Sequence, residues 1–325
     1  MRAAAVALIL AALAAPSAVA QDQRVIAQGV SAGGVDLSGL TVDQATAKLA
    51  ADKGIKQQLS TPLVLGAAGL PWTLTAKDAK LAVDAQTTAE NAAAVVPTTP
   101  TVDVPLVLTH SRVAVTQFVL RVAAGTYRTP RSATLRITLK HMLVRRDKLG
   151  YRLNKSATAK QVNAALDTVD QRTLHQRLIK IRARTTVAGL RRAYPVVLTV
   201  DRDHFRLRLF KRLRISKRYS IAVGMAGLET PTGLYHIQNK QVNPAWHVPH
   251  DAWAGSLQGQ TIPGGAPNNP LKARWMGIAN GVGIHGTAED WSIGSRASHG
   301  CIRMHVSDVI DLYDRVTVGT PVLIG

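Results

Sequence analysis

The sequence has little cysteine, few aromatic residues and few acidic residues. Its 325 residues include one cysteine, Cys301, and only 4% are Phe, Trp or Tyr. A chain with one thiol forms no internal disulfide, so its folded state must depend on apolar cores. Hydrophobic residues make up 46% of the chain. At this length, that content predicts two globular domains or a little more.

Long apolar runs are also scarce. After residue 20, no stretch approaches the roughly 20 apolar residues that a spanning helix needs. Before it, Arg2 precedes an apolar run over residues 3–14, and the small-x-small pattern A-V-A occupies residues 18–20. This pattern predicts a secretory signal peptide over residues 1–20 and an extracytoplasmic location, in a cell wall or periplasm. An uncleaved anchor is the alternative. The absence of a cysteine after the run excludes a lipoprotein anchor.

Acidic residues are outnumbered two to one. The chain has 40 Lys and Arg against 20 Asp and Glu, for a net charge of +20, and residues 121–192 alone hold 18 basic and 3 acidic residues. Behind a signal peptide, this excess favours anionic cell-wall polymers or lipid surfaces as partners rather than nucleic acid. Ordinary solvated charges on helix and strand faces are the alternative.

Periodicity divides the rest of the chain into two regions. Residues 25–192 read as an α+β region with a basic second half. Residues 194–325 read as a mainly β domain with one late helix over residues 306–316, and this domain holds four of the five tryptophans. Strands are expected over residues 196–200, 205–209 and 215–223, with a turn at residues 211–212.

Within the first region, Thr41 is the expected N-cap of a helix with Val42 and Leu49 on its buried face. Residues 62–65 and 72–75 alternate like the strands of a hairpin. The remaining expected helices cover residues 75–82, residues 87–95 and residues 159–178, the last capped by Thr158, with Val162, Ala165, Leu166 and Val169 on one face.

The residues that carry chemistry cluster near the C-terminus. Cys301 lies in the run S-H-G-C-I-R-M, and His285 lies sixteen residues before it in H-G-T. Cysteine catalysis needs a thiolate, a base that forms it and donors for the developing oxyanion. Glycines beside both residues allow a close backbone approach to substrate. Arg303 adds positive charge that is expected to lower the thiol pKa and to bind a carboxylate.

A metal site is the main rival to this interpretation. Five of the ten histidines lie between His236 and His299, so His247, His250 and His299 together with Cys301 form a conceivable ligand set. No H-E-x-x-H motif is present, and Pro249 interrupts the H-x-x-H pair. We therefore expect neither a metal nor another cofactor.

The H-G-T run followed by S-H-G-C-I-R-M resembles the signature of L,D-transpeptidases with a YkuD-type catalytic domain. The runs I-A-V-G, T-P-T-G and N-P-A-W upstream are similar to the same family, and the resemblance covers roughly residues 194–325. The V-D-L-S-G-L-T run with the Trp72 hairpin is similar to YoaR-like peptidoglycan-binding domains, on a less specific match. The first resemblance implies a YkuD-like β-sandwich.

The resemblance also implies an activity. Enzymes of this family attack the third residue of a tetrapeptide stem of peptidoglycan, release the terminal D-Ala and hold a thioester, which an amine of a second stem converts into a 3→3 cross-link. By residue matching, Cys301 is the nucleophile and His285 the general base. The N–H groups of Gly300 and Cys301 are the expected oxyanion hole. Some members carry Ser after the histidine; here the Gly286 carbonyl is the only candidate to orient His285.

Ser298, His299 and Arg303 are the expected substrate-binding residues, with His299 as an alternative base. Three further alternatives concern the whole protein. If water replaces the amine, the protein is a thiol L,D-carboxypeptidase. The second alternative is an inactive domain that only binds cell wall. The third is a metal-dependent amidase.

Overall fold

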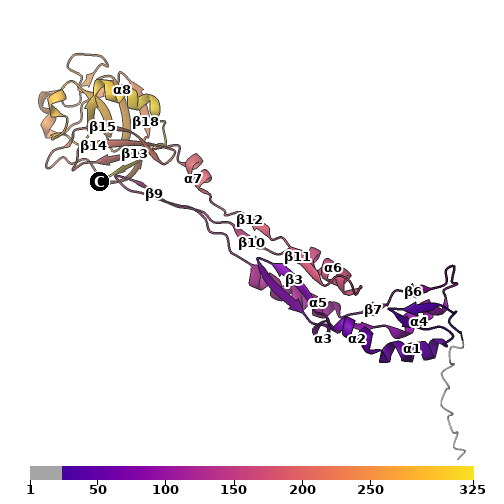
Figure 1. The fold of residues 1–325 in the computed structure, drawn as a ribbon. Helices are drawn as coiled ribbons and strands as arrows, with labels where there is room; N and C mark the ends of the chain where they lie inside the picture. The colour runs from indigo at the N-terminus through magenta and orange to yellow at the C-terminus, as the bar shows by residue number, and fades with distance from the viewer. Residues whose placement is uncertain (1–23) are drawn as a thin grey trace, which may run out of the picture. The chain divides into compact units, whose positions relative to one another are not determined.

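The computed structural model describes residues 24–325, in two compact units that are interleaved along the chain (Figure 1). Unit 1 runs to Arg128 and includes Tyr151–Lys180, whereas unit 2 comprises Thr129–Gly150 and Ile181–Gly325. The units therefore divide the chain differently from the sequence-based boundary at residues 192–194. The predicted signal segment lies outside the described residues.

Unit 1 contains helices and strands around two apolar clusters. One cluster packs α1 (Val42–Ala51) and α4 (Ala85–Ala93) beside the β2-β1-β6 sheet. Thr41 caps α1 as predicted, with a reciprocal hydrogen bond to Gln44. The strands and short elements of this part are β1 (Val30–Ala32), β2 (Val35–Asp36), α2 (Lys53–Ser60), β5 (Ala82–Val83), β6 (Val102–Val104) and β7 (Leu108–Thr109), whereas α3 (Ala76–Ala79) contributes Ala79 to the second cluster.

The second cluster of unit 1 lies between a three-stranded sheet and two helices. The sheet has the order β11-β3-β4, in which β3 (Leu63–Ala67) and β4 (Leu70–Leu74) form the predicted hairpin and β11 (Thr173–Gln176) is the third strand. Buried side chains of α5 (Arg112–Thr126) and α6 (Lys155–Leu166) belong to the same cluster as those of β3. Unit 1 is thus α+β, as predicted.

The helix predicted over residues 159–178 is wrong in its bounds. Asn154 caps α6, which ends at Leu166, and Thr158 lies inside it. The segment after α6 is rich in Asp and β-branched residues, which favour helix less than Ala or Leu. Residues Thr173–Gln176 form β11, which pairs in parallel with β3. Sheet pairing over a long sequence distance therefore overrides the local helical pattern.

Unit 2 is rich in strands, as predicted, and contains two sheets that share one core. The first sheet has the order β15-β14-β13-β25-β17 and the second β18-β21-β22-β24. Side chains of both sheets, such as Leu198 and Ile284, contribute to a single buried cluster. The strands of the two sheets are β13 (Val196–Asp201), β14 (Arg206–Lys211), β15 (Arg214–Ser220), β17 (Gly233–His236), β18 (Asn239–Val242), β21 (Arg274–Ala279), β22 (Val282–Thr287), β24 (Ile302–His305) and β25 (Pro321–Ile324).

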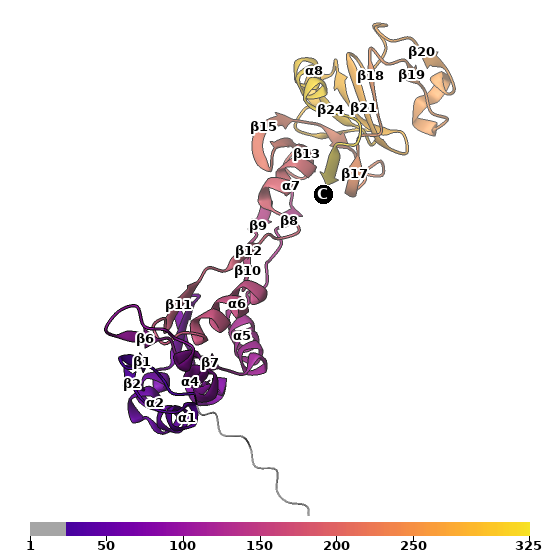
Figure 2. The same cartoon turned by 90° about the vertical axis from the view of Figure 1, so that its right-hand side faces the viewer.

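The predicted late helix is α8 (Val306–Arg315), which packs on β21, β22 and β24 (Figures 1 and 2). Its buried residues Val309 and Leu312 complete the core. The approach to β22 is close, since a Cβ added at Gly286 would lie 3.1 Å from a Val309 methyl carbon. Glycine at this position thus lets the helix press against the strand that carries His285.

Unit 2 also includes a hairpin and a short helix that precede the sheets. The hairpin pairs β8 (Thr134–Ile137) with β9 (Met142–Arg145), and α7 (Val187–Ala193) lies just before β13. The remaining elements of the described chain are β10 (Gly150–Arg152), β12 (Ile179–Ile181), β16 (Val223–Gly224), β19 (Trp246–His247), β20 (Thr261–Ile262), β23 (Arg296–Ser298) and the 3₁₀ turns η1 (Ala252–Leu257) and η2 (Asp290–Ser292). In residues 24–325, no helix is long and apolar enough to cross a membrane.

Candidate active site

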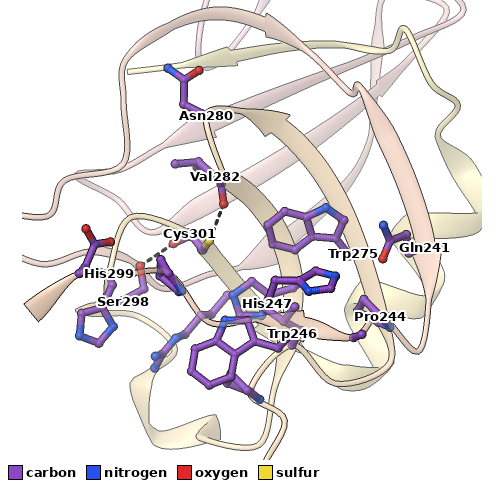
Figure 3. A pocket seen from close by; sticks show the side chains of 18 of the residues that line it. Gln241, Pro244, Trp246, His247, Trp275, Asn280, Val282, Ser298, His299 and Cys301 are labelled. Carbon is purple, nitrogen blue, oxygen red and sulfur yellow. Dashed lines mark hydrogen bonds between the residues drawn. The ribbon is translucent and has the colours of Figure 1, made fainter. Parts of the chain in front are cut away.

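A cavity of about 530 Å³ in unit 2 brings together the predicted catalytic residues. Its wall includes Cys301, His285 and Arg303. Figure 3 shows Cys301 between the loop that carries Ser298 and His299 on one side and Trp275 on the other. A concave site with aromatic walls and a few polar groups is typical of small-ligand sites.

Strand register explains why His285 and Arg303 meet there. In the antiparallel and parallel ladders of the second sheet, Trp275 is opposite His285, and His285 is opposite Arg303. Alternate residues of a strand point to opposite faces, so the neighbours Ile284 and Ile302 enter the core while this row faces the cavity. The row is therefore fixed by backbone hydrogen bonds across three strands.

His285 is held in one orientation by its neighbour. The side chain is 4% exposed, and its Nδ1 lies 2.7 Å from the carbonyl oxygen of Gly286. A carbonyl only accepts hydrogen bonds, so Nδ1 carries the proton. Burial is the main cause that lowers the pKa of His285 to about 4, with a smaller contribution from the Arg303 charge. The ring is then neutral at pH 7 with Nε2 unprotonated, which is the form that a general base requires.

Cys301 is a protonated thiol in this environment. Burial raises the pKa of Cys301 above its ordinary value, and this outweighs a backbone hydrogen bond from Gly283 and the Arg303 charge, both of which lower it. The Arg303 charge lowers the thiol pKa as expected, but desolvation is the larger effect, so the net pKa is raised. In the described chain no hydrogen bond joins Cys301 to His285; the sulfur lies 3.9 Å from the carbonyl oxygen of Gly281. Thiol and imidazole thus face one cavity as a neutral pair.

The turn before Cys301 is held by two hydroxyl groups. Ser298 donates to the carbonyl oxygen of Cys301 at 2.6 Å and accepts from the N–H of Gly300 at 3.3 Å. Gly300 has a φ of 109°, which side-chain-bearing residues rarely adopt. The contacts of Ser298 therefore position the nucleophile, and the Gly300 N–H already has an acceptor. Its use for an oxyanion would require the Ser298 hydroxyl to give way.

Thr230 provides the second hydroxyl and was missed from the sequence as a site residue. It is 1% exposed, donates to the carbonyl oxygen of Gly300 at 2.9 Å and accepts from the N–H of Gly224 at 2.9 Å. One side chain thereby ties the nucleophile turn to β16. Its position in the T-P-T-G run was the only signal, and that run gave no hint of which backbone groups it would meet.

Arg303 is paired with a carboxylate. Its guanidinium forms a salt bridge with Glu289, and the Arg303 side chain is only 12% exposed. The charge faces the cavity from β24, where an anionic group of a ligand would compete with Glu289. The sequence indicated Arg303 but not its partner.

His299 and the tryptophans form the outer wall. His299 stacks on Trp253 with ring centroids 4.0 Å apart and an interplanar angle of 13°. Trp253 belongs to a segment whose small apolar cluster includes Val248 and Ile262. Burial lowers the pKa of His299 as well. The His299 ring thus lines the cavity and stacks on an aromatic ring. The ring of His285, in contrast, has its tautomer fixed by the Gly286 carbonyl.

Three members of the conceivable metal set, His247, His299 and Cys301, line the cavity, whereas His250 is not part of its wall. In residues 24–325 no group of three or more His, Cys, Asp or Glu side chains is arranged to bind a metal ion. His247 contacts the hydroxyl of Thr261 at 3.0 Å, and His299 stacks on Trp253.

Comparison with known families gives two matches. Residues 195–324 match the YkuD family, described as "L,D-transpeptidase catalytic domain". Residues 72–175 match the family described as "Putative peptidoglycan binding domain". The first match lies within unit 2 and contains all the residues of the cavity.

Curated relatives match the same part of the chain. "Putative L,D-transpeptidase YqjB" of Bacillus subtilis is 40% identical over 112 residues, which are 33% of this chain and 57% of that protein. "Putative L,D-transpeptidase YkuD" of Bacillus licheniformis is 36% identical over 131 residues, 40% of this chain and 66% of that protein. The chain thus spans well over half, but less than two thirds, of each relative's length.

Among solved structures, the catalytic domain of the Enterococcus faecium L,D-transpeptidase is 27% identical to this chain. The likeness covers 41% of this chain and 98% of that domain, with a TM-score of 0.33.

Proposed function

We propose that this chain, whose C-terminal domain belongs to the YkuD family of L,D-transpeptidase catalytic domains and follows a peptidoglycan-binding domain, forms 3→3 cross-links in peptidoglycan. The donor is a tetrapeptide stem, and the reaction passes through a thioester on Cys301. No metal or other cofactor takes part. The reaction takes place outside the cytoplasm, after cleavage of the segment over residues 1–20.

The first half of the reaction transfers an acyl group to sulfur. Nε2 of His285 accepts the Cys301 thiol proton as the sulfur attacks the carbonyl carbon of the third stem residue. The C–N bond to the terminal D-Ala breaks, and the proton on Nε2 passes to the departing amine. The second half reverses these steps. An amine of another stem attacks the thioester, its proton passes to Nε2 and then to the sulfur, and the thiol is restored.

One observation carries this proposal. The Nδ1 of His285 is held by the Gly286 carbonyl at 2.7 Å, which leaves Nε2 as the free base in the cavity that Cys301 lines. A buried neutral imidazole and a half-buried neutral thiol that line one cavity are suited to concerted deprotonation during attack. Arg303 is the group that would hold a carboxylate of the stem, by exchange with Glu289.

The acceptor is tested by analysing products. The purified chain without residues 1–20 is incubated with a disaccharide-tetrapeptide, and the products are separated and sequenced by tandem mass spectrometry. We expect a dimer that has lost one D-Ala and is joined between third residues. A disaccharide-tripeptide as the sole product would show the carboxypeptidase reaction instead. Intact substrate, with no product at all, would contradict both and leave cell-wall binding.

A further inference from the structure

Four arginines surround a second cavity of unit 2. The cavity has a volume of about 700 Å³ and is lined by Ala188, Arg191, Arg192, Pro195, Arg212 and Arg214. Arg191 and Arg192 lie in the last turn of α7. Arg212 lies in the tight turn between β14 and β15, and Arg214 is the first residue of β15. No acidic residue is part of the wall. Segments about twenty residues apart thus bring four positive charges to one hollow.

The charges of this arginine cavity have no partner in the described chain. Within residues 24–325, no ion pair or side-chain hydrogen bond engages Arg191, Arg192, Arg212 or Arg214. All four are exposed. Other arginines of the same unit, such as Arg208 and Arg315, have carboxylate partners. Like charges that converge without a counter-charge repel one another, and a bound anion relieves that repulsion.

Packing fixes the two pairs of arginines relative to each other. Arg212 and Leu213, the two central residues of the hairpin turn, both have positive φ, 49° and 65°. Two-residue turns of this kind usually carry Asn-Gly, because most side-chain-bearing residues disfavour positive φ. Leu213 is buried in one apolar cluster with Leu190 of α7, and the Arg212 N–H donates to the carbonyl oxygen of Pro195 at 2.9 Å. The turn is therefore docked on the helix in spite of its conformational cost.

A helix C-terminus also favours basic residues by itself, because of the helix dipole. That effect accounts for Arg191 and Arg192 in the last turn of α7. It does not reach Arg212 and Arg214, which lie in a hairpin turn and at the start of the strand after it. The meeting of the two pairs at one cavity needs a further reason.

We infer that the arginine cavity binds phosphate groups of a phosphodiester polymer of the cell envelope. Guanidinium groups match phosphate oxygens with paired N–H donors and keep their charge at all physiological pH values. At about 700 Å³, the cavity exceeds many times the roughly 30 Å³ that one water occupies, so it has room for more than one hydrated phosphate. The location of the polymer rests on the proposed function; the phosphate specificity does not.

Binding is measured by fluorescence anisotropy with labelled linear polyphosphate, using the chain without residues 1–20. The test variant is R191Q/R192Q/R212Q/R214Q. The matched control is R136Q/R145Q/R146Q/R218Q, which removes four exposed arginines of the same unit that have no carboxylate partner. We expect the test variant to lose at least about tenfold in affinity and the control to change by less than about threefold. Equal losses in both variants would show a net-charge effect and overturn the site.

Two further ligands, a carboxylate polymer and a lipid vesicle, test which kind of anion the arginine cavity binds. Hyaluronate, a carboxylate polymer with one charge on each disaccharide, should bind at least about tenfold more weakly than polyphosphate, which carries a charge on each phosphate and so presents charges at closer spacing. Equal affinity for both would overturn phosphate specificity. Vesicles of equal parts phosphatidylglycerol and phosphatidylcholine should bind the test and control variants alike. A loss confined to the test variant on vesicles, with polyphosphate binding unchanged, would replace the polymer by a lipid surface.

Turnover of a soluble disaccharide-tetrapeptide separates this proposal from the proposed function. The test variant should retain turnover and its melting temperature, because none of its four side chains lines the active-site cavity. If the unmodified chain shows no turnover while the polyphosphate result holds, the arginine cavity stands and the enzyme proposal fails. If turnover persists but the test variant binds polyphosphate as well as the unmodified chain, the arginine cavity fails alone.

Discussion

The nucleophile turn (residues 298–301) and the arginine cavity both lie in unit 2, and they differ in whether their polar groups have partners. Around Cys301, the hydroxyls of Ser298 and Thr230 each hold backbone groups, and Arg303 has a carboxylate partner. Around the arginine cavity, four charged side chains are exposed and have no partner in the described chain. Chemistry needs groups fixed before the substrate arrives, whereas salt-sensitive binding of a polyanion needs accessible charge. Substitutions in the two places should therefore differ in both size and kind.

The largest effect is expected from Cys301→Ala. Removal of the nucleophile should abolish turnover of a disaccharide-tetrapeptide to the level of the reaction without protein. Polyphosphate affinity should stay within about twofold, because the arginine cavity is a separate site. Product formation is followed by liquid chromatography, and circular dichroism checks the fold. Turnover near that of the unmodified chain would refute the thioester mechanism.

The second largest effect should distinguish the roles of His285 and His299, two histidines that line the active-site cavity. His285→Ala should lower kcat by about 10²–10⁴-fold, since general base catalysis is worth that much. His299→Ala removes a ring that stacks on Trp253 and should act mainly on KM, with less than about tenfold loss in kcat. Steady-state kinetics of the two variants make the comparison. The opposite order would transfer the base to His299.

A smaller effect is expected from Thr230, which positions the turn before Cys301 but is not part of that turn. Thr230→Val leaves the carbonyl oxygen of Gly300 and the N–H of Gly224 without their buried partner. That should cost about 1–3 kcal/mol in the free energy of unfolding and lower kcat about tenfold with little change in KM. Thr230→Ser keeps the hydroxyl and is the matched control. A stability loss without any change in kcat would show that Thr230 supports the fold alone.

The smallest effect concerns pH. The pKa of His285 is lowered to about 4 and that of Cys301 is raised, so the neutral pair persists across the range between them. As pH rises, kcat/KM should increase through about pH 4 and then stay level to about pH 8, because the base is free and the thiol is protonated throughout. A profile of kcat/KM measured with fold checks at each pH tests this. An acid limb near the ordinary histidine pKa of about 6.5 would contradict the neutral pair.

Much of the site was accessible from the sequence because its signals are local. The runs around His285 and Cys301 specify residue types at fixed spacing, and the Gly286 carbonyl was the only candidate to orient the ring. The active-site contacts that were missed join distant segments: Thr230 meets Gly300 across seventy residues, and Trp253 meets His299. The net rise of the thiol pKa also depends on burial, which the surrounding chain determines.

The fold shows the same limit. Capped helices and alternating strands followed from local pattern, as in α1 and β14. The predicted helix over residues 159–178 was too long because β11 gains its stability from β3, more than a hundred residues earlier. The basic stretch over residues 121–192 read as one feature, yet it is divided between the two units, and its Arg191 and Arg192 meet arginines of a later hairpin. Contacts between segments that lie far apart in the sequence leave no periodic pattern in it, so periodicity could not predict them.

The central claim is that Cys301 carries the acyl group, and intact-protein mass spectrometry tests it most directly. The chain without residues 1–20 is mixed with a disaccharide-tetrapeptide, quenched in acid within the first turnover and weighed. We predict a mass increase equal to the substrate minus D-Ala, located on Cys301 by peptide mapping and absent from Cys301→Ala. Cross-linked product that accumulates with no adduct at any time, or an adduct that persists in Cys301→Ala, would contradict the account.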